Sequence, residues 1–164
     1  MEVCIKGSAE SVKLGDIDEV CVEIGRILLP TDGSEPSVAA TEYAVALAKT
    51  FGAKVKAIYV DTGLEALEYP EEVMTEDVYE GVHPSIKGLA LANTLCERNG
   101  VSCEVEIVRG GVAKRIVATA EDWKADLIVI GDTGRTGLKR IALGSVAETV
   151  VKGSPIPVLV VKAD

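Results

Sequence analysis

Residues 126–131 read Asp-Leu-Ile-Val-Ile-Gly, a short run that is apolar on both faces. A strand buried on both faces is typical of a parallel sheet that helices cover on both sides. Similar runs lie at 26–30, at 55–60 and, as the last element, at 157–162. Between 102 and 107 polar and apolar residues alternate instead, which predicts a strand with one wet face near a sheet edge.

Helix-like patterns separate these five runs, with turn and cap residues at their ends. They cover about residues 35–51, 85–99, 112–123 and 145–152. Regular alternation of strand and helix implies parallel pairing with crossover helices. The sequence therefore predicts an α/β fold, a five-stranded parallel sheet with helices on both faces.

The 164 residues suit one domain, yet two segments depart from the alternation. Residues 1–25 do not fit it, so we interpret them as an N-terminal extension ahead of a domain at 26–164. Residues 61–84 hold eight acidic residues and no Lys or Arg. We expect a solvated connector there, with a regulatory or partner-binding loop as the alternative.

Composition excludes several classes of partner. The 17 basic and 26 acidic residues give a net charge of −9, and aromatic residues make up 4% of the chain. The chain thus offers neither the positive surface that binds the phosphate backbone of nucleic acid nor the aromatic side chains on which bases stack. The longest dense apolar run, 156–161, is far short of the roughly 20 residues that a membrane span needs, and the first residues do not resemble a secretory signal.

The cysteines point to a reducing compartment. Cys4, Cys21, Cys96 and Cys103 form no CxxC pair, and the single His83 cannot complete a usual zinc set with them. We expect reduced thiols in a cytoplasmic protein and no metal centre in the protein itself. His83 precedes a proline, which favours a surface turn over a catalytic role.

Residues 131–145 are the most informative for function: Gly-Asp-Thr-Gly-Arg-Thr-Gly-Leu-Lys-Arg-Ile-Ala-Leu-Gly-Ser. The stretch starts where a buried strand ends and finishes where a helix begins. Glycines let the backbone approach a ligand, and a helix start attracts phosphate. The alternative is a turn whose glycines cap elements and whose Ser145 is an N-cap. The spacing matches neither GxxxxGK[ST], GxGxxG nor GxSxG.

The spacing of the glycines in this stretch resembles the ATP-binding signature of universal stress proteins. Two residues separate Gly131 from Gly134, and nine residues separate Gly134 from Gly144-Ser145. The runs 27–34, 127–131, 143–148 and 155–161 resemble that family's first strand and turn, fourth strand, closing helix and closing strand. The resemblance covers about residues 26–162. The N-terminal extension and the acidity of the connector are departures from it.

The resemblance implies a Rossmann-like fold of the adenine nucleotide alpha hydrolase type, in which 26–164 is the nucleotide-binding domain. It implies ATP as ligand, with Mg²⁺ held mostly by ATP and water. Asp32 would meet adenosine, Val60 adenine, and the glycines and Ser145 the ribose and phosphates. An Asp before Gly-Ser is otherwise a turn residue. The implied ATP contacts are Pro30, Thr31, Asp32, Val60, Ile130, Gly131, Gly134, Arg135, Gly144, Ser145 and Val146.

The function so predicted is that of an ATP-binding switch or sensor in the stress response, working as a homodimer through the strand at 157–162. In the alternative arrangement, the extension at 1–25 pairs with that strand in place of a second protomer. No general base or nucleophile stands out, so efficient catalysis has no support. Two alternatives stay open: a dimerisation module that binds partners without nucleotide, and a slow ATP hydrolase in which Asp32 or Asp132 orients water.

Overall fold

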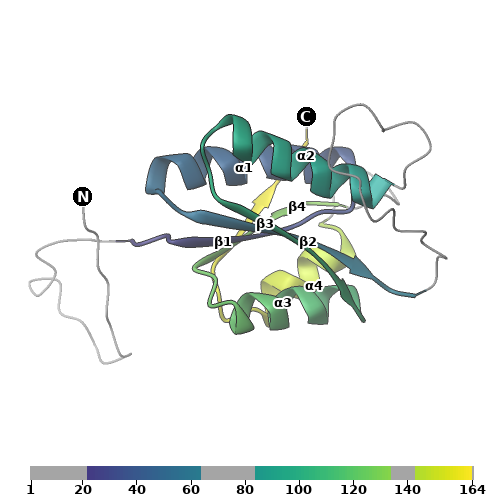
Figure 1. The fold of residues 1–164 in the computed structure, drawn as a ribbon. Coiled ribbons are helices and arrows are strands. Elements are labelled where there is room, and N and C mark those ends of the chain that lie inside the picture. The colour runs from purple at the N-terminus through teal and green to yellow at the C-terminus, as the bar shows by residue number, and fades with distance from the viewer. Residues whose placement is uncertain (1–21, 64–83, 134–142, 164) are drawn as a thin grey trace, which may run out of the picture.

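A computed structural model describes residues 22–63, 84–133 and 143–163, and these form one parallel sheet between two helix layers (Figure 1). The sheet order is β3-β2-β1-β4-β5, and each neighbouring pair is parallel. The predicted α/β fold with five parallel strands is confirmed. The strands are β1 Arg26–Pro30, β2 Lys54–Asp61, β3 Cys103–Arg109, β4 Leu127–Gly131 and β5 Val158–Val161.

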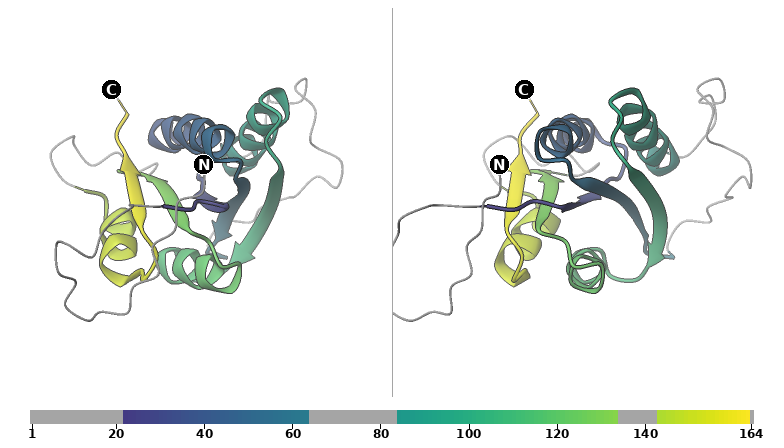
Figure 2. Two further views of the ribbon diagram at one scale, coloured as in Figure 1. Left: turned by 90° about the vertical axis from the view of Figure 1, so that its left-hand side faces the viewer. Right: turned by 60° about the vertical axis from the view of Figure 1, so that its left-hand side comes forward.

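Helices cover both faces, as expected, because the direction of strand addition reverses at β1. The chain first adds β2 and β3 on one side of β1 and then β4 and β5 on the other. Right-handed crossovers in opposite directions place their helices on opposite faces. Figure 2 shows α1 and α2 on one face and α3 and α4 on the other. The helices are α1 Glu35–Phe51, α2 Pro84–Arg98, α3 Val112–Asp122 and α4 Ser145–Gly153.

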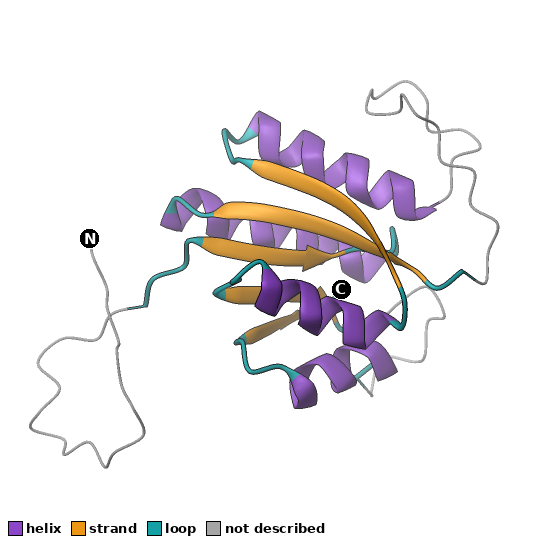
Figure 3. Cartoon of the chain, turned by 60° about the horizontal axis from the view of Figure 1, so that its bottom comes forward, coloured by secondary structure: helices purple, strands orange, loops and turns teal. Residues whose placement is uncertain are grey.

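Each face of the sheet has its own hydrophobic core. Ile27 and Leu29 of β1 face the α1/α2 layer, and Leu28 between them faces the α3/α4 layer. All three side chains are fully buried. A strand that alternates between two apolar layers must be apolar at its buried positions, which is why β4 and the part of β1 after Arg26 are continuous apolar runs. Figure 3 shows the sheet from the α3/α4 side.

The two edge strands differ as their sequences suggested. β3 is an edge strand with exposed Glu104 and Glu106, which confirms the predicted wet face. β5 is the opposite edge, and Val158, Leu159 and Val160 are only partly buried.

Parts of the two irregular segments lie outside the described residues, namely 1–21 of the extension and 64–83 of the acidic connector. Asp61 belongs to β2 rather than to a connector, and it is 4% exposed. Pro84 is the first residue of α2, a position where its fixed φ angle suits a helix and its missing N–H is not needed. None of the helices in the described part of the chain is long and apolar enough to span a membrane.

Candidate functional site

β1 and β4 do not pair up to their carboxyl ends, and the unpaired stretch between Pro30 of β1 and Gly131 of β4 is the opening of the sheet at this point. The described ladder between these strands stops at Leu28 opposite Ile128, while β1 still pairs with β2 at Pro30 opposite Ile58. The N–H of Thr31 donates to the carbonyl of Ile58 at 2.8 Å, so the preceding residue faces β4. Pro30 has no N–H to offer there. The strands therefore part where the strand order reverses, the place where open α/β sheets bind ligands.

An apolar wall stands on the α3/α4 side of this opening. Val60 of β2 and Ile130 of β4 belong to the core cluster on that side. Pro30 lies two residues after Leu28 and shares its face, because side chains alternate along a strand. Val60 and Ile130 are 5% and 6% exposed, so only the outer edge of the wall is open. The structure thus places Val60 and Ile130 in one core cluster and Pro30 on the same face of the sheet.

Gly131 lets the start of α1 rest directly on the end of β4. A Cβ atom at Gly131 would lie 2.7 Å from the carbonyl carbon and 2.8 Å from the carbonyl oxygen of Pro36. Contacts that short are not tolerated between real atoms, so this position requires glycine. The absence of a side chain therefore places the loop between β1 and α1 beside the end of β4.

Gly144 joins the two ends of the glycine–serine loop. Its N–H donates to the carbonyl of Asp132 at 2.7 Å. A Cβ atom there would lie 2.9 Å from that oxygen and 3.1 Å from Cα of Thr133. The start of α4 is thereby held against the end of β4.

The start of α4 has no side-chain cap. Gly144 is the N-cap residue, and Ser145 is the first helical residue, with an exposed side chain. Ser145 is therefore not the N-cap, whereas the other part of the turn alternative, a glycine that caps an element, is borne out by Gly144. The N–H of Glu148 donates to the carbonyl of Gly144 at 2.9 Å. The N–H groups of the three residues before Glu148, Val146 among them, have no acceptor inside the helix and point out of its positive end.

The loop after β1 is tied to itself and to α1. Oδ1 of Asp32 accepts hydrogen bonds from the N–H of Ser34 at 3.0 Å and from its hydroxyl at 2.5 Å. Oγ1 of Thr31 donates to Oγ of Ser37 at 3.2 Å, so the side chain of Thr31 lies on the α1/α2 side, away from the apolar wall. These bonds fit the turn alternative for Asp32, and its contact with adenosine stays a prediction.

Gly88 of α2 is a positioning residue that the sequence reasoning missed. A Cβ atom there would lie 2.4 Å from Oγ1 of Thr31 and 2.9 Å from the backbone nitrogen of Gly33. The helix thus presses on the loop that carries Asp32. A glycine in the middle of an amphipathic helix was the available signal, since it lowers helix stability and commonly marks close packing.

Asp61 adds a second feature that the sequence reasoning placed in the connector. The buried carboxylate Oδ2 of Asp61 lies 3.2 Å from Nε of Arg109, an exposed residue at the end of β3. Its other oxygen accepts the N–H of Gly63 at 2.7 Å. The negative charge next to Val60 is therefore compensated, so that end of the sheet does not repel an anion as strongly as a bare carboxylate would.

Two predicted site residues, Gly134 and Arg135, lie outside the described residues. Among those that are described, no three His, Cys, Asp or Glu side chains are grouped so that they could hold a metal ion. Asp132 is half-buried, and its Oδ1 accepts the hydroxyl of Thr133 at 3.2 Å.

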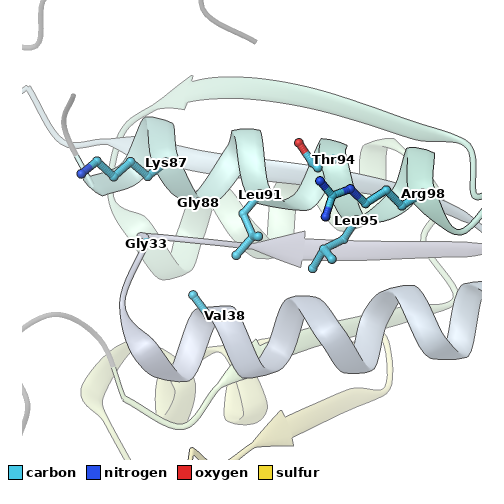
Figure 4. Close-up of a pocket in the computed structure, with 8 residues that line it drawn as sticks. All are labelled: Gly33, Val38, Lys87, Gly88, Leu91, Thr94, Leu95 and Arg98. Carbon is cyan, nitrogen blue, oxygen red and sulfur yellow. The ribbon is translucent and has the colours of Figure 1, made fainter. Parts of the chain in front are cut away.

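A hollow of about 390 Å³ lies elsewhere, between α1 and α2 (Figure 4). Leu91 of α2 points toward Val38 of α1 across it, Leu95 points toward α1 farther along, and Gly33 lies at one end. The lining residues are Gly33, Val38, Lys87, Gly88, Leu91, Thr94, Leu95 and Arg98.

Fold and site together define a doubly wound α/β protein that has a glycine–serine loop at the point where the strand order reverses. A family model described as the universal stress protein family matches residues 23–162. The chain belongs to this family, and the resemblance found in the sequence is confirmed.

Individual universal stress proteins and a solved structure are similar to this chain over most of its length. Universal stress protein MJ0531 of Methanocaldococcus jannaschii is 44% identical over 138 residues, which cover 84% of this chain and 81% of the relative. Universal stress protein MJ0577 of the same organism is 32% identical, with 84% of this chain and 94% of the relative covered. A crystal structure of a universal stress protein in complex with cAMP superposes with a TM-score of 0.65 at 27% identity, covering 87% of this chain and 99% of that one.

Proposed function

We propose that this protein binds ATP at the carboxyl ends of β1 and β4 and acts as a nucleotide-dependent switch or sensor in the stress response. The observation that carries the proposal is the uncapped start of α4, which the hydrogen bond from Gly144 to Asp132 holds beside the opening. A relative that was crystallised with cAMP supports an adenine nucleotide as the ligand class.

The phosphates would lie at the start of α4. Backbone N–H groups at a helix start favour an anion through hydrogen bonds and the helix dipole together. The exposed hydroxyl of Ser145 adds one donor at the same place. Gly134 and Arg135 lie in the sequence between β4 and α4, and they would complete the phosphate contacts.

The adenosine would lie against the apolar wall of Pro30, Val60 and Ile130. Asp32 follows the end of β1, and its carboxylate would accept hydrogen bonds from the ribose hydroxyl groups or from the amino group of the base. Gly131 contributes by its lack of a side chain, because it keeps the loop of Asp32 next to the end of β4.

Mg²⁺ would arrive with the nucleotide. Since no cluster of three ligating side chains exists among the described residues, phosphate oxygens and water would supply most of its coordination. We assign no catalytic step to the protein.

Dimerisation is the second part of the proposal. β5 is a sheet edge whose Val158, Leu159 and Val160 are partly exposed, and an uncovered apolar edge invites pairing. A two-fold contact with a second copy would satisfy its backbone groups. Free thiols at Cys96 and Cys103 agree with the cytoplasm as the working compartment.

Calorimetry with ATP on the Ser145→Ala variant tests the site. Losing one hydrogen bond to a charged group costs about 1.5–3 kcal/mol, so the affinity should fall by roughly 10- to 150-fold. Ser102→Ala is the matched control, because Ser102 is an exposed serine just before β3, at the opposite end of the sheet. Equal ATP affinity of both variants and the native protein would remove the Ser145 hydroxyl from the phosphate contacts. Tighter binding of NAD than of ATP would contradict the ligand class.

A further inference from the structure

Two cysteines that the proposed ATP site does not use come together on the α1/α2 side of the sheet. Cys96 lies on the buried face of α2 in line with Leu89 and Ala92, and it is fully buried. Cys103 is the first residue of β3, and it packs against the same core cluster from a partly exposed position.

The turn between α2 and β3 determines this meeting. Gly100 takes a left-handed conformation with φ of 69°, which reverses the chain directly after the helix. The N–H of Val101 then donates to the carbonyl of Cys96 at 2.9 Å. Two residues later Cys103 pairs with Val55 of β2, so its side chain points to the layer that contains α2.

The two thiols interact with each other, and the interaction shifts their pKa values in opposite directions. It lowers the pKa of Cys103, as does a backbone hydrogen bond with Ala57, although burial and the charges of Glu104 and Glu97 act in the opposite direction. The same interaction, followed by burial, raises the pKa of Cys96. Cys103 therefore has the lowered pKa of the pair, and its Sγ also donates to the carbonyl of Glu104 at 3.7 Å. The partly exposed position of Cys103 also makes it the thiol that a small solute reaches.

We propose that Cys96 and Cys103 form a peroxide-reactive dithiol, in which Cys103 is the attacking thiol and Cys96 resolves it to a disulfide. The Cys103 thiolate attacks one oxygen of hydrogen peroxide. A sulfur–oxygen bond forms, the oxygen–oxygen bond breaks, and the leaving hydroxide takes up a proton to become water. Cys96 then loses its proton and attacks the Cys103 sulfur. The sulfur–sulfur bond replaces the sulfur–oxygen bond, and a second water leaves.

The electrons balance over the two steps, because the thiol pair gives up two electrons and hydrogen peroxide is reduced to two molecules of water. The product is a disulfide that joins the end of α2 to the edge strand β3. A thiol with a lowered pKa beside a resolving cysteine is the usual arrangement of a reversible thiol oxidation site.

Peptide mapping of the full chain tests the proposal. After stepwise addition of hydrogen peroxide, the remaining thiols are alkylated and the protein is digested and analysed by mass spectrometry. We expect a linked peptide pair that contains Cys96 and Cys103 and disappears on reduction. The same pair should form unchanged in a Cys4→Ser, Cys21→Ser double variant, which removes the two cysteines of the N-terminal extension.

Single variants separate the two roles. In Cys96→Ala the reaction should stop at a sulfenic acid on Cys103, which dimedone captures, and the linked pair should be lost completely. In Cys103→Ala, Cys96 should remain a thiol at peroxide amounts that consume the native pair. The proposal is overturned if no Cys96–Cys103 peptide forms in the native chain. It is also overturned if Cys103 advances to sulfinic acid there while Cys96 stays reduced.

Discussion

Replacing Gly131 with alanine should destabilise the fold through a single contact. The new Cβ would lie 2.7, 2.8 and 2.9 Å from three atoms of Pro36, and two of these are backbone atoms of the first turn of α1. Because backbone cannot rotate away as a side chain can, α1 must shift from the sheet. Overpacking costs about 1–3 kcal/mol, and we expect the upper end of that range.

A smaller effect acts in the opposite direction. Alanine restricts the unfolded chain more than glycine does, which contributes about 0.4–1 kcal/mol of stability. The net loss should be about 2 kcal/mol, which lowers the urea midpoint by about 1 M at the m-values usual for small proteins. Equilibrium urea unfolding followed by circular dichroism measures this midpoint.

Gly153→Ala is the matched control. Gly153 is the last residue of α4, it is exposed, and nothing lies within 4 Å of the position that its Cβ would take. It should be as stable as the native protein or slightly more stable. If Gly131→Ala unfolds at the same urea concentration as Gly153→Ala, the close approach of α1 to β4 does not limit this position and the reasoning fails.

Three further perturbations test other parts of the structure. Gly88→Ala should lower both the unfolding free energy and the affinity for ATP, because its Cβ would lie 2.4 Å from Oγ1 of Thr31; unchanged values in urea unfolding and calorimetry would contradict this. Val160→Lys should turn a dimer into a monomer in analytical ultracentrifugation, and a persistent dimer would place the interface elsewhere. Burial lowers the pKa of Lys56, but hydrogen bonds to two glutamates of β3 raise it more, so the net shift is upward from 10.5. The stability that the ion pairs of Lys56 with these two glutamates contribute is present below pH 10.5 and is lost as the pH rises through the folded pKa of Lys56. In urea unfolding, the Lys56→Met variant should not show this loss of stability at alkaline pH.

Periodicity in the sequence was enough to predict the sheet. Apart from the charged first residues Arg26 and Asp126, the runs at 26–30 and 126–131 are apolar at every position, a pattern typical of a strand covered on both faces. Alternation in the run at 102–107 identified an edge strand for the same reason. These features depend on residues that are close in the sequence and on whether each side chain is polar or apolar, and both can be read from the sequence directly.

The glycine–serine spacing was likewise enough to select the family. It also predicted that the site lies at the carboxyl ends of the strands. The role of each glycine, however, depends on what lies across from it in space. Gly131 is needed because Pro36 covers it, and Gly144 because Asp132 lies beneath it.

Tertiary structure alone decided the features that join distant parts of the chain. Asp61 looked like one of eight acids in a connector, yet it is buried because β2 continues to that residue and Arg109 of β3 pairs with it. Cys96 and Cys103 had no spacing motif, and they meet because a left-handed glycine turns α2 back onto β3. Sequence by itself determined which segments must be buried, since burial follows from side-chain chemistry. Which buried groups touch depends on strand order and on the approach of the helices, and these are properties of the whole packed chain.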